Sequence, residues 1–382
     1  MIGRWGALLV MATGRVAMGV QFQSIGALGP FLVGTIAADY ATLGTLIGAY
    51  LLPGMFVAIP MGWMMARIGD KRMMVAGLAL MSVGAALLAL ADGFAGALVA
   101  RLVAGTGAAL LSLAGAKMVL DRFLGGALAP AMGVMLSAWP CGLALALVLL
   151  PLVATDGQWR WGIAASALLS VAAMLLLAAR LPRDPPRVAG SVMPKLGLRP
   201  GEWAPLLAVG TLWASYNAAY AVALGFAPAL LVAQGMDAAS AGTIASLIGW
   251  MILPLLPLGG WLAERTGRPM LITVLCMAGM GAALAAASRG MAPAVSLGLF
   301  GVLAAPPASL IMAMAGRALS PASRGFGMGI FYTQFYAGMA LLPALAGWTR
   351  DLTGDPGAPL LAGVFFLLVS FGALLAYLRS AR

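Results

Sequence analysis

Apolar runs follow one another along most of the chain, with only short polar breaks between them. Each run spans about 18–25 residues, long enough to cross a hydrocarbon core of roughly 30 Å as a helix. Barrel strands instead alternate apolar and polar positions over about ten residues, and these runs do not. Because only helices and closed barrels satisfy the backbone in lipid, the pattern predicts an all-α membrane protein.

Twelve spans are predicted. One polar, proline-rich stretch from Arg180 to Glu202 separates the sixth span from the seventh. The chain is therefore expected to form an N-terminal six-helix bundle (1–180), a cytoplasmic linker (181–202) and a C-terminal six-helix bundle (203–382). The predicted spans are 5–35, 43–66, 73–91, 95–117, 127–154, 161–180, 203–232, 239–263, 270–288, 292–316, 325–348 and 357–378.

Composition and charge support this prediction and set an orientation. Hydrophobic residues make up 63% of the chain and charged residues 9%, whereas soluble domains carry about 25% charged residues. The net charge of +11 is spread over loops, which argues against a nucleic-acid partner. With the N-terminus in the cytoplasm, all loop lysines and arginines except Arg160, Arg289 and Arg350 fall inside. The positive-inside rule then predicts a multi-pass protein of the bacterial inner membrane with both termini cytoplasmic.

The two halves of the chain repeat each other at a fixed offset. A shift of 198 residues superposes Pro30 on Pro228, Asp39 on Asp237 and Gly44 on Gly242. A shift of six spans preserves membrane orientation, so the halves are expected to be parallel repeats about an axis along the membrane normal. The same shift carries Ala41 onto Ala239, Thr45 onto Thr243, Gly62 onto Gly260, Arg67 onto Arg265 and Gly69 onto Gly267.

The loops after spans two and eight resemble the major facilitator superfamily signature G-x-x-x-(D/E)-R-x-G-x-(K/R). In this signature the first glycine permits close helix packing and the next glycine ends a helix. The acid and arginines are expected to pair across a cytoplasmic gate. Ala66 replaces the usual acid in the first loop. The matching residues are Gly62, Arg67, Gly69 and Asp70 in the first loop and Gly260, Glu264, Arg265 and Gly267 in the second.

The resemblance extends over the whole chain and implies a function. Arg101, followed by Gly105 and Gly107, is similar to the superfamily's second motif, which implies a structural or gating role. Members of the superfamily are twelve-helix secondary transporters that expose a midplane site alternately to each side. Small-anion permeases of the cyanate and nitrate kind also place arginines near the cavity. Span five, around Trp139 and Pro140, loosely resembles the motif of proton-driven antiporters, so a drug or neutral-solute exporter is the alternative.

Ionisable residues inside the predicted spans are all positive: Arg15, Arg101 and Lys117. Every acid maps to a loop or a span end, and the chain has no histidine. Arg15 lies about ten residues into its span, about 15 Å deep. An arginine at this depth is costly unless it faces a cavity or a partner. We interpret Arg15 as an anion anchor, the alternative being a structural arginine bonded to helix carbonyls; Lys117 is expected to extend to the headgroups.

Polar and aromatic side chains recur in spans one, seven and eleven. Hydroxyl and amide groups there are candidates to complete the hydrogen-bond shell of a solute, although ordinary interhelical contacts would use the same residues. The candidate substrate-binding residues, besides Arg15, are Gln23, Tyr216, Asn217, Tyr220, Tyr332, Gln334, Tyr336 and Trp139.

The sequence thus predicts a secondary active transporter that moves a small anionic solute by rocker-switch alternating access. Protons or a counter-anion are the expected coupling partners, and we expect a monomer in the lipid bilayer. The spans contain no grouped residues of a catalytic site, so we predict that the chain is not an enzyme and uses no cofactor or metal. A non-transporting sensor is a further alternative, but no loop is long enough to hold a soluble domain.

Overall fold

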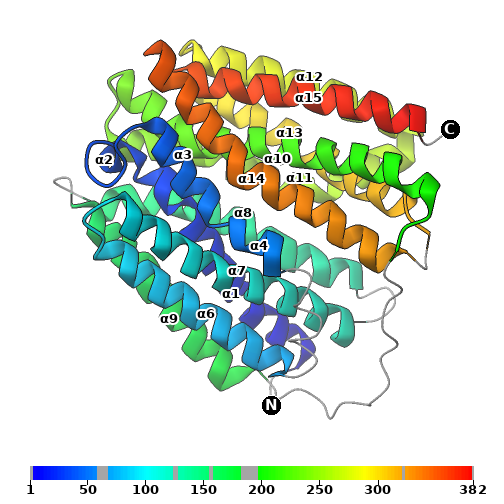
Figure 1. Cartoon of the computed structure of the whole chain (residues 1–382), viewed down its shortest axis with the longest axis horizontal. Helices are drawn as coiled ribbons and strands as arrows, with labels where there is room; N and C mark the ends of the chain where they lie inside the picture. Colours follow the sequence, from blue (N-terminus) through cyan, green and yellow to red (C-terminus); the bar gives the residue numbers. More distant parts are fainter. Residues whose placement is uncertain are drawn as a thin grey trace.

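Long helices account for nearly all of the chain in the computed structural model, which describes residues 3–57, 68–123, 128–154, 158–181, 197–320 and 323–380. Figure 1 shows the helices running roughly alongside one another, with both termini at the same end of the molecule. We call this the terminal end and the opposite end the far end. The helices before the linker are α1 (Arg4–Ala27), α2 (Gly29–Leu32), α3 (Tyr40–Ala49), α4 (Leu52–Val57), α6 (Asp70–Ala89), α7 (Phe94–Arg122), α8 (Leu128–Val153) and α9 (Trp159–Arg180). Those after it are α10 (Pro200–Ala233), α11 (Ala238–Thr266), α12 (Pro269–Ser288), α13 (Pro293–Arg317), α14 (Arg324–Thr353) and α15 (Ala358–Ser380).

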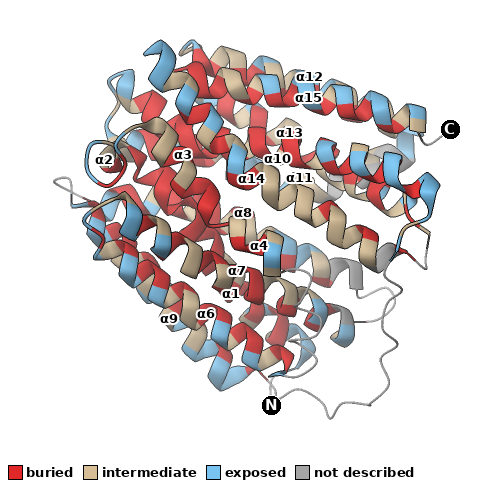
Figure 2. Cartoon of the chain, viewed as in Figure 1, coloured by how far each residue is buried: buried red, intermediate tan, exposed pale blue. Residues whose placement is uncertain are grey.

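The surface of the bundle suits a membrane. Within the described residues, ten segments are long and apolar enough to cross one. Figure 2 shows exposed residues along the outward faces of the helices and buried residues between them. Large apolar side chains stand on those outward faces, among them Leu168 at 70% exposure and Phe365 at 61%. An apolar exterior of this extent is expected of a lipid-facing protein.

Two long helices, α1 and α14, are not among the ten apolar segments. Both carry polar residues in their middle sections, including Arg15 and Gln21 in α1 and Thr333 and Gln334 in α14. Buried polar groups in a membrane protein pair with one another or line a cavity. The two least apolar spans are therefore candidates to contribute to a polar internal site.

The first two predicted spans are more broken than the apolar pattern indicates, and the end of the second lies outside the described residues. The prediction of one span over 5–35 is wrong at its end, because α1 stops at Ala27 and a separate short helix, α2, follows. The segment predicted as 43–66 begins earlier, at Tyr40, and is interrupted between α3 and α4. Pro53, the second residue of α4, has no backbone N–H to continue the hydrogen bonding of α3.

The 198-residue repeat has a clear structural counterpart. The Asp39 carboxylate accepts a hydrogen bond from the Thr42 N–H at 2.8 Å, and Asp237 accepts one from the Ser240 N–H at 2.9 Å. Each therefore caps the start of the second long segment of its half. Hydrogen bonds from the side chain and backbone of Ser240 lower the pKa of the Asp237 carboxyl. Equivalent positions in the two halves thus cap the N-termini of corresponding helices.

Glycines let the halves approach closely toward the far end. A Cβ at Gly44 of α3 would collide with the Pro343 carbonyl of α14, and one at Gly242 of α11 would collide with the Leu147 carbonyl of α8. These two glycines are also related by the 198-residue shift. In Figure 1, α3 (blue) and α14 (orange) lie side by side at the far end, in agreement with their contacts. The interface between the halves is therefore closely packed there.

Candidate functional site

Arg15 lies halfway along α1, and its guanidinium sits where α1, α7 and α14 meet. Nη1 donates a hydrogen bond to the Ser112 hydroxyl of α7 at 3.0 Å. The same hydroxyl bonds the Met18 sulfur at 3.2 Å, which fixes Ser112 against α1. From the other half, Tyr332 and Tyr336 of α14 are close enough to interact electrostatically with the guanidinium. The depth predicted for Arg15 is thus consistent with its place in the helix.

The charge of Arg15 is not neutralised by the protein in the part of the chain described here. Its Nε atom is buried and has no hydrogen-bond partner. The ion pairs between described residues join Lys117 to Asp70 and Asp121, and Arg160 to Asp92; none includes Arg15. No carboxylate is among the groups that act on the guanidinium electrostatically. Arg15 is therefore a partly buried cation with free hydrogen-bonding capacity at its buried Nε.

Tyr336 brings the C-terminal half up against the site. Its ring lies against Gly54 of α4, where a Cβ would have no room. The ring also lines a narrow cavity together with Tyr50, Met18 and Ser112. Since Ser112 holds Arg15, this cavity is next to the guanidinium. Residues of both halves therefore enclose the space beside Arg15.

The three candidates of span seven do not all point toward Arg15. The Tyr216 hydroxyl donates to the Ala304 carbonyl of α13, and the Asn217 amide donates to the Trp213 carbonyl at 2.8 Å. The Tyr220 ring stacks on Phe300 of α13 with centroids 6.2 Å apart, and its buried hydroxyl has no partner. This group therefore mainly joins α10 to α13 within one half.

Gln23, Gln334 and Trp139 also make contacts away from the guanidinium. Gln23 lies two helical turns beyond Arg15, about 12 Å along α1, and donates to the Leu224 carbonyl of α10 at 2.7 Å. Gln334 accepts a hydrogen bond from the Thr211 hydroxyl at 3.3 Å, so it faces α10. Trp139 packs on Phe22 with centroids 5.2 Å apart. Of the predicted substrate-binding residues, Arg15, Tyr332 and Tyr336 are the ones brought together.

Arg101 has a fully engaged guanidinium within the N-terminal half. Its Nε, Nη1 and Nη2 atoms donate to the carbonyls of Leu46, Gln21 and Phe22 at 2.9, 2.7 and 3.1 Å. The guanidinium carbon also lies 4.5 Å from the Tyr50 ring centroid. These contacts tie α7 to α1 and α3, and match the structural part of the role expected for Arg101.

The predicted gating loops are described only in part. Gly62 and Arg67 lie outside the described residues. Gly69 and Gly267 have φ of 102° and 64°, and stand immediately before α6 and immediately after α11. A positive φ favours glycine, which explains this residue at both equivalent positions. Gly260, Glu264 and Arg265 lie in the last turns of α11.

The sequence predicts that Lys117 extends to the headgroups, whereas the structure places its ammonium group in two ion pairs. Its Nζ atom lies 2.7 Å from both the Asp70 and the Asp121 carboxylates. The Asp70 side chain is only 11% exposed, so this ion pair joins α6 to α7 at the terminal end. Asp70, a residue of the predicted gating loop, is therefore linked to α7.

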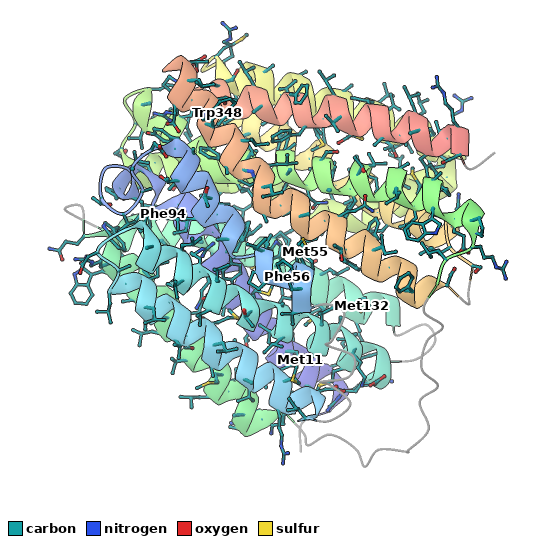
Figure 3. The ribbon with its side chains drawn as sticks, viewed as in Figure 1. Met11, Met55, Phe56, Phe94, Met132 and Trp348 are labelled. Atoms are coloured by element: carbon teal, nitrogen blue, oxygen red, sulfur yellow. The ribbon has the colours of Figure 1, made fainter. Side chains whose placement is uncertain are left out.

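One contact between the halves was not predicted. The Asp351 carboxylate at the end of α14 accepts hydrogen bonds from the N–H groups of Tyr40 and Ala41 at 3.0 and 2.7 Å. It therefore binds the free N-terminus of α3 in the opposite half. Beside it, the Arg350 guanidinium lies 3.6 Å from the Tyr40 ring centroid. No local motif marks this contact, because its members are more than 300 positions apart. Trp348 stands nearby on the far-end part of α14 (Figure 3).

Solved transporters share this architecture. A D-xylose–proton symporter is 14% identical with a TM-score of 0.76, over 96% of both chains. The peptide transporter POT in complex with sulfate is 14% identical with a TM-score of 0.78, over 100% of this chain and 96% of that one. A bacterial homolog of the human lysosomal transporter Spinster, inward-facing and occupied, is 17% identical with a TM-score of 0.76, over 99% and 97%. At these identities the likeness establishes the fold alone.

A family model gives the assignment that structural likeness alone does not. No curated protein sequence matches the chain significantly. The model of the Major Facilitator Superfamily, however, matches residues 11–288 and 206–382, which together cover nearly the whole chain. The two matches overlap over residues 206–288. The chain therefore belongs to the Major Facilitator Superfamily and is a membrane transporter, not an enzyme.

Proposed function

We propose that this transporter moves a small anionic solute, a carboxylate or an inorganic anion, and that Arg15 binds its charge. The observation that carries the proposal is the partly buried Arg15 guanidinium, which lacks a carboxylate partner among the described residues and leaves its buried Nε unbonded. A central charge in a membrane helix is costly unless something compensates it. An anionic solute would supply the missing partner, because a guanidinium forks around a carboxylate or oxyanion.

Tyr332 and Tyr336 give the site a second side. They belong to α14, whereas Arg15 belongs to α1, so a solute between them would contact both halves at once. Binding would then favour the state in which the halves close around the solute, as rocker-switch transport requires. With the predicted orientation, the tightly packed far end faces outside, so the arrangement corresponds to a state that is closed to the outside. We propose that the protein acts as a monomer in the bacterial inner membrane.

Coupling follows from the charge of the solute. Moving one negative charge inward against 100 mV costs about 2.3 kcal/mol. Uptake would therefore need co-transported protons or a counter-anion, whereas export would proceed with the field. The peptide transporter POT has this fold and was solved in complex with sulfate, which is a precedent for anion binding in that protein.

Thermal unfolding of the purified protein with a panel of solutes tests the proposal. The panel contains nitrate, sulfate, acetate and benzoate, with tetraphenylphosphonium and xylose as a cation and a sugar. We expect at least one anion to raise the Tm of the wild type and of Arg160→Gln, but not of Arg15→Gln. Arg160 is the matched control because it removes the same charge at a half-exposed site beside Asp92.

Two results would contradict the proposal. An anion that stabilises Arg15→Gln as much as the wild type would remove Arg15 from the binding site. A shift of the wild type by tetraphenylphosphonium or xylose alone would favour a drug or neutral-solute exporter.

A further inference from the structure

We infer that the transported anion is organic, with a flat aromatic or similarly planar apolar body that lies against rings of α10 and α14. The inference rests on the proposed function, since it takes Arg15 as the charge anchor, and it adds what the rest of the solute contacts. We call Trp213, Tyr332, Phe335 and Tyr336 the aromatic wall.

The rings of the aromatic wall form one continuous surface. Phe335 lies at the centre of the set. Its ring centroid is 5.2 Å from that of Tyr336, 6.3 Å from that of Tyr332 and 6.2 Å from that of Trp213. Its contacts with the two tyrosines are edge-to-face, and the Trp213 contact is tilted. Such arrangements leave ring faces and edges available to a further aromatic ring.

Two rings of the wall, Tyr332 and Tyr336, lie beside Arg15. Tyr332, Phe335 and Tyr336 are spaced by three and four positions, so they share one face of α14. The two tyrosines of this set interact electrostatically with Arg15. Around the axis of α14, Phe335 lies next to Tyr332 on the side away from Tyr336, where it contacts Trp213 of α10. It therefore extends the surface of the two tyrosines from the α1 side toward α10, and a planar solute held at Arg15 reaches Phe335 by extending past the tyrosines.

Burial separates the wall from the core behind it. Phe331 and Tyr216 also contact Trp213, and they are 0% and 2% exposed. All four residues of the aromatic wall are only partly buried. The buried pair is ordinary core packing, whereas the wall presents free ring surface.

The internal repeat places the cation and an indole at equivalent positions. The shift of 198 residues carries Arg15 onto Trp213, and the two halves are parallel repeats, so the two residues lie at corresponding depths of α1 and α10. The Trp213 Nε1 atom is buried and has no hydrogen-bond partner. The site therefore offers a charge on one half and aromatic surface with a spare N–H donor on the other.

These features favour an aromatic anion over an inorganic one. The face of an aromatic ring is the negative part of its quadrupole, so it gives a bare anion no attraction. An inorganic anion would be bound best by donors on all sides, and Phe335 provides none. An aromatic carboxylate uses both parts of the site, because its charge meets Arg15 and its ring meets the wall.

Titration calorimetry of the purified full-length protein with benzoate, acetate and nitrate tests the inference. We expect the wild type to bind benzoate about tenfold more tightly than acetate or nitrate, because one or two ring contacts contribute about that much to affinity. Phe335→Leu should weaken benzoate binding about fivefold and leave acetate binding unchanged. Phe365→Leu, on the exposed face of α15, is the matched control and should bind both as the wild type does.

The possible outcomes distinguish this inference from the proposed function on which it rests. If acetate or nitrate binds the wild type as tightly as benzoate, the aromatic body is wrong and the Arg15 anion site stands. If Phe335→Leu keeps the full preference for benzoate, the wall does not contact the solute. If none of the three anions binds, the proposed function itself fails. The wild-type comparison needs no variant, so it holds even if Phe335→Leu folds poorly.

Discussion

Arg15 and Arg101 are both arginines inside helices of the same half, yet their surroundings differ. Arg101 donates from all three of its nitrogens to backbone carbonyls. Arg15 bonds one serine and leaves Nε unused. A buried arginine with each nitrogen engaged holds a structure together, whereas one with an unbonded nitrogen is suited to bind a ligand. The two residues should therefore respond differently to substitution.

Substitution of Arg101 should chiefly cost stability. Arg101→Met removes three hydrogen bonds from a charged group, each worth roughly 1.5–3 kcal/mol, so we expect the Tm in detergent to fall markedly. Arg160→Met, at a half-exposed ion pair, should change stability by about 1 kcal/mol or less. Equal Tm values for the two variants would show that the Arg101 contacts do not stabilise the bundle.

Substitution of Ser112 should chiefly weaken binding. Ser112→Ala removes the hydrogen bond that positions Arg15, and we expect anion affinity to fall about threefold to tenfold, the worth of one such bond. Ser112→Thr keeps a hydroxyl and should retain more affinity. Calorimetry with benzoate measures both, and an unchanged affinity in Ser112→Ala would mean that Arg15 needs no positioning by α7.

The position of a functional residue along its helix could be predicted from the sequence. Its contacts with other helices could not, because they depend on packing. The mid-helix place of Arg15 follows from counting residues along an apolar run. Its partner Ser112 lies 97 positions away, and only the packing of α1 against α7 brings them together. Gln23 and Tyr216 share the polar stripes that suggest a site, yet backbone carbonyls take their hydrogen bonds.

At the scale of elements, the far-end contact between α14 and α3 has no counterpart between the described residues of α8 and α11. Asp351 binds the N-terminus of α3. The 198-residue shift places Val153 of α8 at the equivalent position, and valine has no carboxylate to offer α11. A carboxylate at a helix N-terminus is stabilised by the exposed N–H groups and the helix dipole. Asp351 should therefore favour the state in which the far end is closed.

Loss of this carboxylate should open the far end. Spin labels are placed at the exposed positions 35 and 289 after replacement of both native cysteines, and the distance between them is measured by double electron–electron resonance. We expect Asp351→Asn to add a longer distance to the measured distribution. Asp355→Asn is the matched control, since its carboxylate bonds the nearby Gly357 N–H within its own loop. A distribution unchanged in Asp351→Asn would rule out a role in closure.

Helix ends show how far sequence patterns reach at this scale. The twelve-span pattern and the 198-residue repeat predict the order of helices, and Asp39 and Asp237 cap corresponding helices as the repeat implies. The break between α3 and α4 escapes prediction, because hydropathy averages over the proline that causes it. Apolar runs indicate which residues are buried in lipid or protein, but they do not predict where a helix is kinked or broken.

At the scale of the whole molecule, the charge distribution predicts an orientation. Both termini lie at the same end (Figure 1), and the loop arginines are expected to hold that end in the cytoplasm. A C-terminal green fluorescent protein fusion should therefore fluoresce in bacterial cells, whereas a C-terminal alkaline phosphatase fusion should be inactive. An active phosphatase fusion would reverse the orientation and the direction assigned to the closed far end.

The central claim is that Arg15 supplies the charge that binds the solute. Solid-supported membrane electrophysiology on proteoliposomes tests it most directly, with concentration jumps of benzoate and acetate. The account predicts a transient current of negative charge in the wild type and in Arg160→Gln, and none in Arg15→Gln. A current of the same size in Arg15→Gln would contradict it.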